Sequence, residues 1–207
     1  MKNYLIAAIC FLITLSFSAC DSGEQTADGE TGVATVAGVD STLTQERQEF
    51  LMTAARNIML QKELAKMALE KSETRNAKAY GQDLMNWATT KQNELQELAQ
   101  RYGVTLPQQM EDRQIKHIED VTEVEATNYE YDLELWDSIK DAQKEAIDDF
   151  DESLNDVEEA DATALTLWSR NTRKELWAHL EQAAAYGLEL KNREGGIAEP
   201  IVEDINN

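Results

Sequence analysis

From Ser41 to about residue 192, apolar residues recur every three or four positions, which is the spacing of one face of an α-helix. Only two prolines and nine glycines occur in the 207 residues, so few positions interrupt this pattern. A chain of this length fits one ordinary domain, and a hydrophobic content of 42% is sufficient for a core. The pattern therefore predicts an all-α domain.

Breaks in the periodicity divide this domain into four long helices and one short helix. Ser72 or Thr74 can cap the second long helix, Gly103 ends it, and Pro107 confirms the break. Short connections between long amphipathic helices favour an antiparallel four-helix bundle, with the short helix between the second and third long helices. The expected helices cover about residues 44–71, a second from 73 or 75 to 102, and 109–121, 126–154 and 162–192.

The first twenty residues have the pattern of an export signal. Lys2 precedes an apolar run over residues 4–17, which is short for a membrane span but has the length of a signal-peptide core. The small pair Ser18-Ala19 then precedes Cys20. This arrangement resembles the lipobox of bacterial lipoproteins, in which the cysteine is acylated and becomes the new N-terminus. Phe17 stands where lipoboxes usually have Leu, and the alternative is a soluble secreted protein cleaved nearby.

Acylation of Cys20 would leave no free thiol in the mature chain, because Cys10 is removed with the signal peptide. The residues that follow are rich in glycine and small polar residues, and such a composition does not order itself. The segments expected from these patterns are a lipoprotein signal peptide (1–19), an acidic and glycine-rich flexible tether (20–43), the helical domain (44–192) and a disordered tail (193–207).

A net charge of −21 argues against nucleic acid as a partner, because no basic surface is available to neutralise phosphates. The expected partners are the membrane, through the lipid, and an envelope protein. Asp21 and the acids after it resemble the export signal of some Bacteroidota surface lipoproteins, whereas Asp directly after an acylated cysteine marks inner-membrane retention in enterobacteria. We expect anchoring in the outer membrane rather than the inner one, on either its periplasmic or its surface face.

The sequence contains no complete catalytic or metal-binding motif. A di-iron bundle uses Glu-x-x-His pairs, but Gln114 stands three residues before His117 and Leu176 three residues before His179. The acids at 148–152 lack the alternating ligands and the glycine of a calcium loop. We therefore expect no catalytic residue, no metal and no cofactor.

Four short stretches are similar to one known family. They are Glu49-Phe50, the run at 63–70 (ELAKMALE), the run at 102–107 (YGVTLP) and the run at 176–180 (LWAHL). Over about residues 46–190 the chain resembles bacterial lipoproteins of unknown function with a ferritin-like four-helix domain, often labelled predicted outer-membrane proteins. The resemblance implies a ferritin-like fold, and the family has no established activity.

The chain departs from this family at positions where members often carry metal-ligating side chains. Glu is common where this chain has Gln61, Asp-His where it has Trp87-Ala88, and Asp-His where it has Ala142-Gln143. The replacements are mostly unable to bind a metal. Iron or oxygen chemistry of the ferritin kind is therefore not expected.

The same positions suggest a buried polar layer. Gln61, Gln143 and His179 fall in register with the apolar stripes near the middle of three helices, and Trp87 would fill the space from the second helix. Two amides and a neutral imidazole can satisfy one another without an ion. The hypothesis is a relic of a metal site, and the alternative is three unrelated residues with His179 as an ordinary core histidine.

Two functions follow from these patterns. The first is a non-catalytic, lipid-anchored bundle that binds an envelope partner or has a structural role. The alternative is a ferritin-like metal-binding or redox protein with degenerate or unrecognised ligands.

Overall fold

The computed structural model describes residues 43–72, 74–124, 128–155 and 157–194. Cys20, the predicted signal peptide and nearly all of the predicted tether lie outside these residues, as does the tail from 195 onward. The described chain forms the helices α1 (Gln45–Lys71), α2 (Arg75–Tyr102), α3 (Asp112–Thr122), α4 (Asn128–Leu154) and α5 (Ala164–Glu194). The prediction of an all-α fold with a short helix between the second and third long helices is confirmed.

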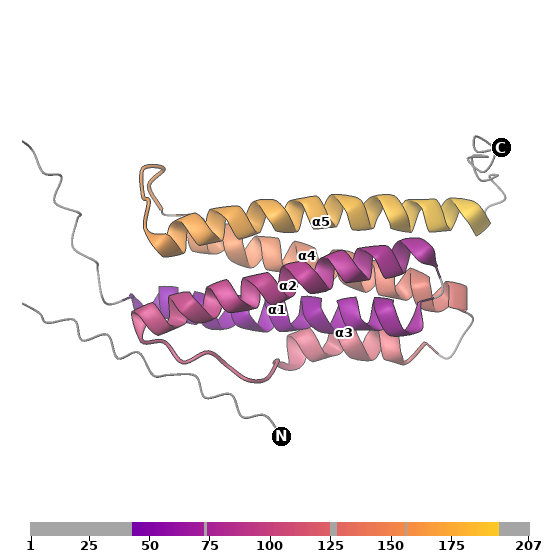
Figure 1. Cartoon of the computed structure of the whole chain (residues 1–207), viewed down its shortest axis with the longest axis horizontal. Coiled ribbons are helices and arrows are strands. Elements are labelled where there is room, and N and C mark those ends of the chain that lie inside the picture. The colour runs from indigo at the N-terminus through magenta and orange to yellow at the C-terminus, as the bar shows by residue number, and fades with distance from the viewer. Residues whose placement is uncertain (1–42, 73, 125–127, 156, 195–207) are drawn as a thin grey trace, which may run out of the picture. The chain divides into compact units, whose positions relative to one another are not determined.

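The four long helices pack in a ring in which each helix is antiparallel to its two neighbours (Figure 1). Helix α1 contacts α2 and α4, and α5 contacts α4 and α2. Helix α3 lies outside the ring against α1 and α4, and it runs toward the end of the bundle at which α4 begins (Figure 1). None of the described helices is long and apolar enough to cross a membrane.

Capping residues determine where α2 begins and ends. Of the two predicted caps it is Thr74 that begins α2, because its hydroxyl accepts a hydrogen bond from the Ala77 amide at 3.3 Å. Gly103 ends the helix in the left-handed conformation, with φ of 67°. The Gly103 amide donates to the Gln100 carbonyl, and the Val104 amide donates to the Ala99 carbonyl at 2.9 Å. These two bonds satisfy carbonyls that the helix end would leave open.

Helix α3 begins three residues later than predicted and is held by polar contacts. The Glu111 amide donates to Gln114 Oε1, which places the helix start at Asp112. The side-chain Nε2 of Gln114 also donates to Asn57 Oδ1 on α1 at 3.2 Å, and Asn57 Nδ2 donates to the Asp149 carboxylate on α4 at 2.8 Å. Arg113 reaches the same Asp149 carboxylate at 2.6 Å. Hydrogen bonds to α1 and α4 therefore contribute to the docking of α3.

Helices α1 and α2 approach each other closely at Gly81. A Cβ atom at this position would lie 2.8 Å from the Ala68 Cβ and 3.0 Å from the Ala65 carbonyl oxygen. Only glycine fits opposite two alanines at this separation without a shift of the helices. The small residues thus determine the spacing of the α1–α2 pair.

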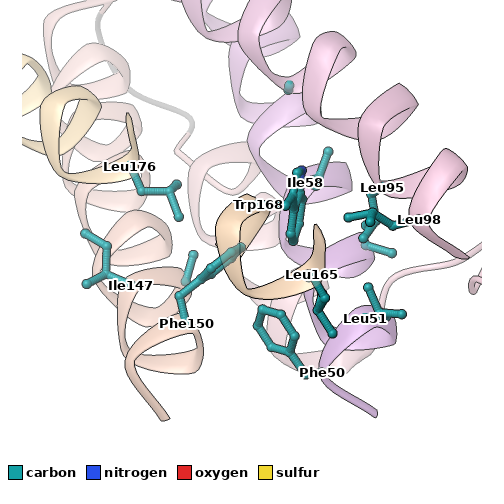
Figure 2. Packing of buried hydrophobic residues seen from close by; sticks show 14 of the residues in the cluster. Phe50, Leu51, Ile58, Leu95, Leu98, Ile147, Phe150, Leu165, Trp168 and Leu176 are labelled. Atoms are coloured by element: carbon teal, nitrogen blue, oxygen red, sulfur yellow. The ribbon is translucent and has the colours of Figure 1, made fainter. Parts of the chain in front are cut away.

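The apolar core consists of two clusters, one toward each end of the bundle. In the first, Phe50 and Phe150 pack edge to face with 5.0 Å between ring centroids, and Trp168 packs against Phe150 (Figure 2). The second cluster includes Leu135 and Ile139 of α4, both 0% exposed. Leu133 of the same helix, which also stands at helical spacing from Tyr129 and Trp136, is only partly buried.

Candidate functional site

Polar side chains occupy the region between the two apolar clusters, near the middle of the bundle. Gln61 of α1 and Gln143 of α4 are both 0% exposed. Gln143 Nε2 donates to Gln61 Oε1 at 3.4 Å and to the Tyr80 hydroxyl at 2.5 Å. Two residues of the predicted layer therefore meet in the core, and a tyrosine from α2 joins them.

Tyr80 extends this hydrogen-bond chain to α5. Its hydroxyl donates to the backbone carbonyl of His179 at 3.2 Å. Burial raises the pKa of the Tyr80 hydroxyl well above its ordinary value, and the hydrogen bond from Gln143 lowers it by less. The phenol therefore stays protonated at neutral pH, so it acts as a hydrogen-bond donor and not as an anionic ligand or base.

The His179 imidazole takes part in the layer by packing. Its ring stands edge-on to Tyr80 and lies 5.2 Å from the Trp87 ring between centroids. Burial lowers the pKa of His179 below its ordinary value, and the charges of Glu175 and Asp83 oppose this shift with a smaller effect. The imidazole is therefore neutral near pH 7. It is the backbone carbonyl of His179, and not its ring, that joins the hydrogen-bond chain.

Trp87 fills space beside His179, and it also connects the layer to a second polar group. Its indole Nε1 donates to Glu175 Oε2 at 2.7 Å. That oxygen lies 2.8 Å from the Nζ atom of Lys91, whose side chain is only 7% exposed. Glu94 Oε2 lies 2.9 Å from the same nitrogen and accepts from the Trp168 indole at 3.1 Å.

We call Lys91, Glu94, Glu175, Trp87 and Trp168 the lysine cluster. Burial favours a neutral amine at Lys91, but hydrogen bonds and charge from Glu175 and Glu94 outweigh it and raise the pKa of Lys91 above its ordinary value. A nucleophilic lysine requires the opposite shift, toward a neutral amine at pH 7. Lys91 is therefore a charged structural group that joins α2 to α5.

Three buried polar atoms of the layer have no hydrogen-bond partner: Gln61 Nε2, Gln143 Oε1 and His179 Nδ1. An unpaired buried polar atom typically costs about 1–3 kcal/mol. The oxygen and the ring nitrogen are also atom types that can ligate a metal ion. Within the described ranges, no group of three His, Cys, Asp or Glu side chains is placed to hold a metal ion.

Comparison with known protein families identifies the domain over most of the described chain. The model of DUF4142, a domain of unknown function, matches residues 33–186 of the chain. The chain belongs to the DUF4142 family. No curated protein and no solved structure matches it.

The DUF4142 match begins inside the stretch predicted as a tether and extends through most of α5. It therefore includes both the polar layer and the lysine cluster. The family description names no activity, so any function of this DUF4142 chain must be argued from its own residues.

Sequence reasoning missed the lysine cluster, although a signal for it exists. Lys91 stands at helical spacing from the buried residues Leu84, Ala88 and Leu95, so it lies on the inner stripe of α2. A lysine in such a register needs an anionic partner, and Glu94 is three residues away. Its second partner, Glu175, is supplied by another helix and has no local signal in the sequence of α2.

Proposed function

We propose that this DUF4142 protein is a non-catalytic, lipid-anchored helical bundle of the bacterial cell envelope that binds a protein partner. Cys20 carries the lipid, and the outer membrane is the preferred location. The helical domain is of the ferritin-like type, which the antiparallel ring and the connection through α3 support. The predicted lipobox and the resemblance to bacterial lipoproteins support the anchor.

The chemistry of the bundle centre supports a non-catalytic role. Tyr80 and His179 are held in neutral forms, and Lys91 is held as a paired cation. A general base or nucleophile needs a poised and accessible group. Tyr80 and His179 instead pack against each other in the core, and Lys91 is paired with two carboxylates, so these residues join the helices.

The outward side of α5 is the observation that supports a binding role. Leu167, Trp177 and Leu188 are 46%, 43% and 61% exposed. Single exposed apolar residues are common, but three on one helix, including a tryptophan, have the composition of a protein interface. The inner side of the same helix is also apolar, with Leu176 and Ala183 buried in the core. Helix α5 therefore has an apolar side that the bundle does not cover.

The anchor is tested by Cys20→Ala in the full chain, expressed in a bacterium fed an alkyne-tagged palmitate. We expect the natural sequence to become labelled, and the variant to stay unlabelled and unprocessed, because no other residue can receive the acyl chains. Cys10→Ala is the matched control and should be labelled normally. Labelled Cys20→Ala protein would show that the anchor is wrong.

Metal binding is the second candidate function, and the unpartnered atoms Gln143 Oε1 and His179 Nδ1 favour it. Under the leading proposal, Fe²⁺ or Zn²⁺ should leave the melting temperature of the full chain unchanged. Binding to the folded state would raise it. A metal-dependent rise that disappears in His179→Ala would establish the second candidate instead.

A further inference from the structure

Six exposed residues on the outward side of α5, which we call the α5 stripe, have a symmetric order. They are Leu167, Lys174, Trp177, Ala178, Glu181 and Leu188, and the small exposed residues Asn171 and Ala185 lie on the same side of the helix. Four of them, Leu167, Lys174, Glu181 and Leu188, are spaced by seven residues and so lie near one line along the helix. Trp177 and Ala178 stand at the midpoint of this line.

The charge of this surface differs from that of the whole protein. The chain carries a net charge of −21, and two copies therefore repel each other in most orientations. Among the α5 residues of the described chain that are exposed as whole residues, the charged ones are Lys174, Glu181 and Lys191, whereas the part-exposed Glu175 is paired with Lys91. Two molecules can meet along α5 without bringing acidic clusters together.

The order of residues in the stripe is self-complementary. In an antiparallel pair of α5 helices centred between Trp177 and Ala178, Lys174 of each copy lies level with Glu181 of the other. Leu167 then lies level with Leu188, and each Trp177 lies level with an alanine, Ala178. A two-fold interface requires this property. When residue i of one copy contacts residue j of the other, residue j of the first copy also contacts residue i of the second, so the two residues must be complementary.

We infer that the α5 stripe binds the α5 stripe of a second copy of this chain in an antiparallel, two-fold arrangement. This inference rests on the proposed function, because it names the partner of the α5 surface. An unrelated partner would have no need for a stripe that is complementary to itself. The symmetric order of opposite charges and leucines therefore favours a second copy.

The expected dimer is weak in dilute solution. The stripe is about 32 Å long at 1.5 Å per residue, so a single helix pair buries less than the roughly 1,000 Å² of a stable interface. Attachment of both copies to one membrane raises their effective concentration. The dimer should therefore form mainly where the chain is anchored.

Cysteine cross-linking of the full, membrane-bound chain tests the arrangement. Ala178→Cys lies next to the two-fold axis, so a short bismaleimide should join two copies. Leu167→Cys alone and Leu188→Cys alone should stay monomeric, whereas differently tagged copies of these two variants should cross-link when expressed together. The chain without an introduced cysteine is the control. Efficient cross-linking of Leu167→Cys with itself would overturn the antiparallel arrangement.

Charge reversal provides an independent test in the Ala178→Cys background. Lys174→Glu places like charges opposite each other twice and should lower the cross-linking yield about tenfold. Adding Glu181→Lys restores both pairs and should restore the yield. Lys191→Glu is the matched control, because it makes the same charge change outside the stripe and should leave the yield near that of the parent.

Failure of this inference is distinguishable from failure of the proposed function. Palmitate labelling together with cross-linking of Ala178→Cys to a different envelope protein would refute the second copy and retain the proposed function. Labelling with no cross-linked product at all would refute both the second copy and the binding role of α5. Absence of labelling would refute the anchor itself.

Discussion

The lysine cluster allows a quantitative prediction for Lys91→Met. Methionine keeps an unbranched apolar stem, so the substitution removes the charge of a side chain that is 7% exposed and retains most of its packing. What remains is a pair of carboxylates, Glu94 and Glu175, that both faced the same ammonium group at 2.9 and 2.8 Å. Two like charges are then left close together without a cation between them.

The magnitude follows from the geometry and from the exposure of the partners. A hydrogen bond to a charged group contributes about 1.5–3 kcal/mol, and Lys91 makes two. The Glu94 and Glu175 side chains are 40% and 42% exposed, so water compensates for part of each loss. We expect Lys91→Met to lower the free energy of unfolding by about 2 kcal/mol.

Urea unfolding followed by tryptophan fluorescence measures this change, because the Trp87 and Trp168 indoles donate to the same two carboxylates. Adding Glu94→Gln and Glu175→Gln to Lys91→Met removes both unpaired charges and should recover at least half of the loss.

Lys66→Met is the matched control. Lys66 is 52% exposed and lies 3.8 Å from Glu63, so its loss should cost less than about 0.5 kcal/mol. If Lys91→Met is as stable as the natural protein, the cost of burying the ammonium equals the gain from its ion pairs, and the reasoning is refuted.

Two further perturbations test the core. His179 has a folded-state pKa below its ordinary value of 6.5, so it contributes stability above pH 6.5. This contribution is lost as the pH falls below 6.5, because the unfolded chain then binds a proton that the folded chain does not. His179→Phe should therefore lose less unfolding free energy between pH 7 and 5 than the natural protein, and equal losses in the two proteins would contradict the shift. Gly81→Ala should cost about 1–3 kcal/mol, because its Cβ would lie 2.8 Å from that of Ala68. Gly187→Ala, whose Cβ would meet Trp136 at an ordinary 3.6 Å, should be neutral or slightly stabilising in the same thermal melts.

The positions of the helices could be predicted from the sequence because their signals are local. Thr74 and Gly103 supply cap chemistry within a few residues of the helix ends. The inner stripes follow from spacing alone: Ala54 and Ile58 of α1 and Leu84 and Leu95 of α2 recur at helical spacing and are at most 2% exposed. The short helix was placed less accurately, because its start depends on a side-chain bond between Gln114 and the Glu111 amide.

The polar contacts could be predicted only in part. The apolar stripes predict that Gln61 and Gln143 point into the core. The sequence predicts only that Tyr80 packs there, because the hydrogen bond of its hydroxyl with Gln143 depends on the three-dimensional arrangement of the helices. Every residue has a backbone carbonyl, so no residue type marks the acceptor at His179. The outward side of α5 was not predicted as a binding surface. One apolar stripe is sufficient to pack a helix against the core, and the outward stripe carries charged residues at two of its positions.

The polar layer also restricts how the helices can slide past one another. Alanine and leucine contacts are non-directional, so a shift of α4 along α1 by one turn, about 5.4 Å, would find similar apolar surfaces. The same shift would separate Gln143 from both Gln61 and Tyr80, which now lie within 3.4 Å and 2.5 Å of it. Their buried amide and hydroxyl groups would then face hydrocarbon. The layer thus fixes the axial register of α4, in the same way as a single buried asparagine fixes the register of a coiled coil. It selects one position of α4 along the bundle axis among several that apolar packing alone would permit.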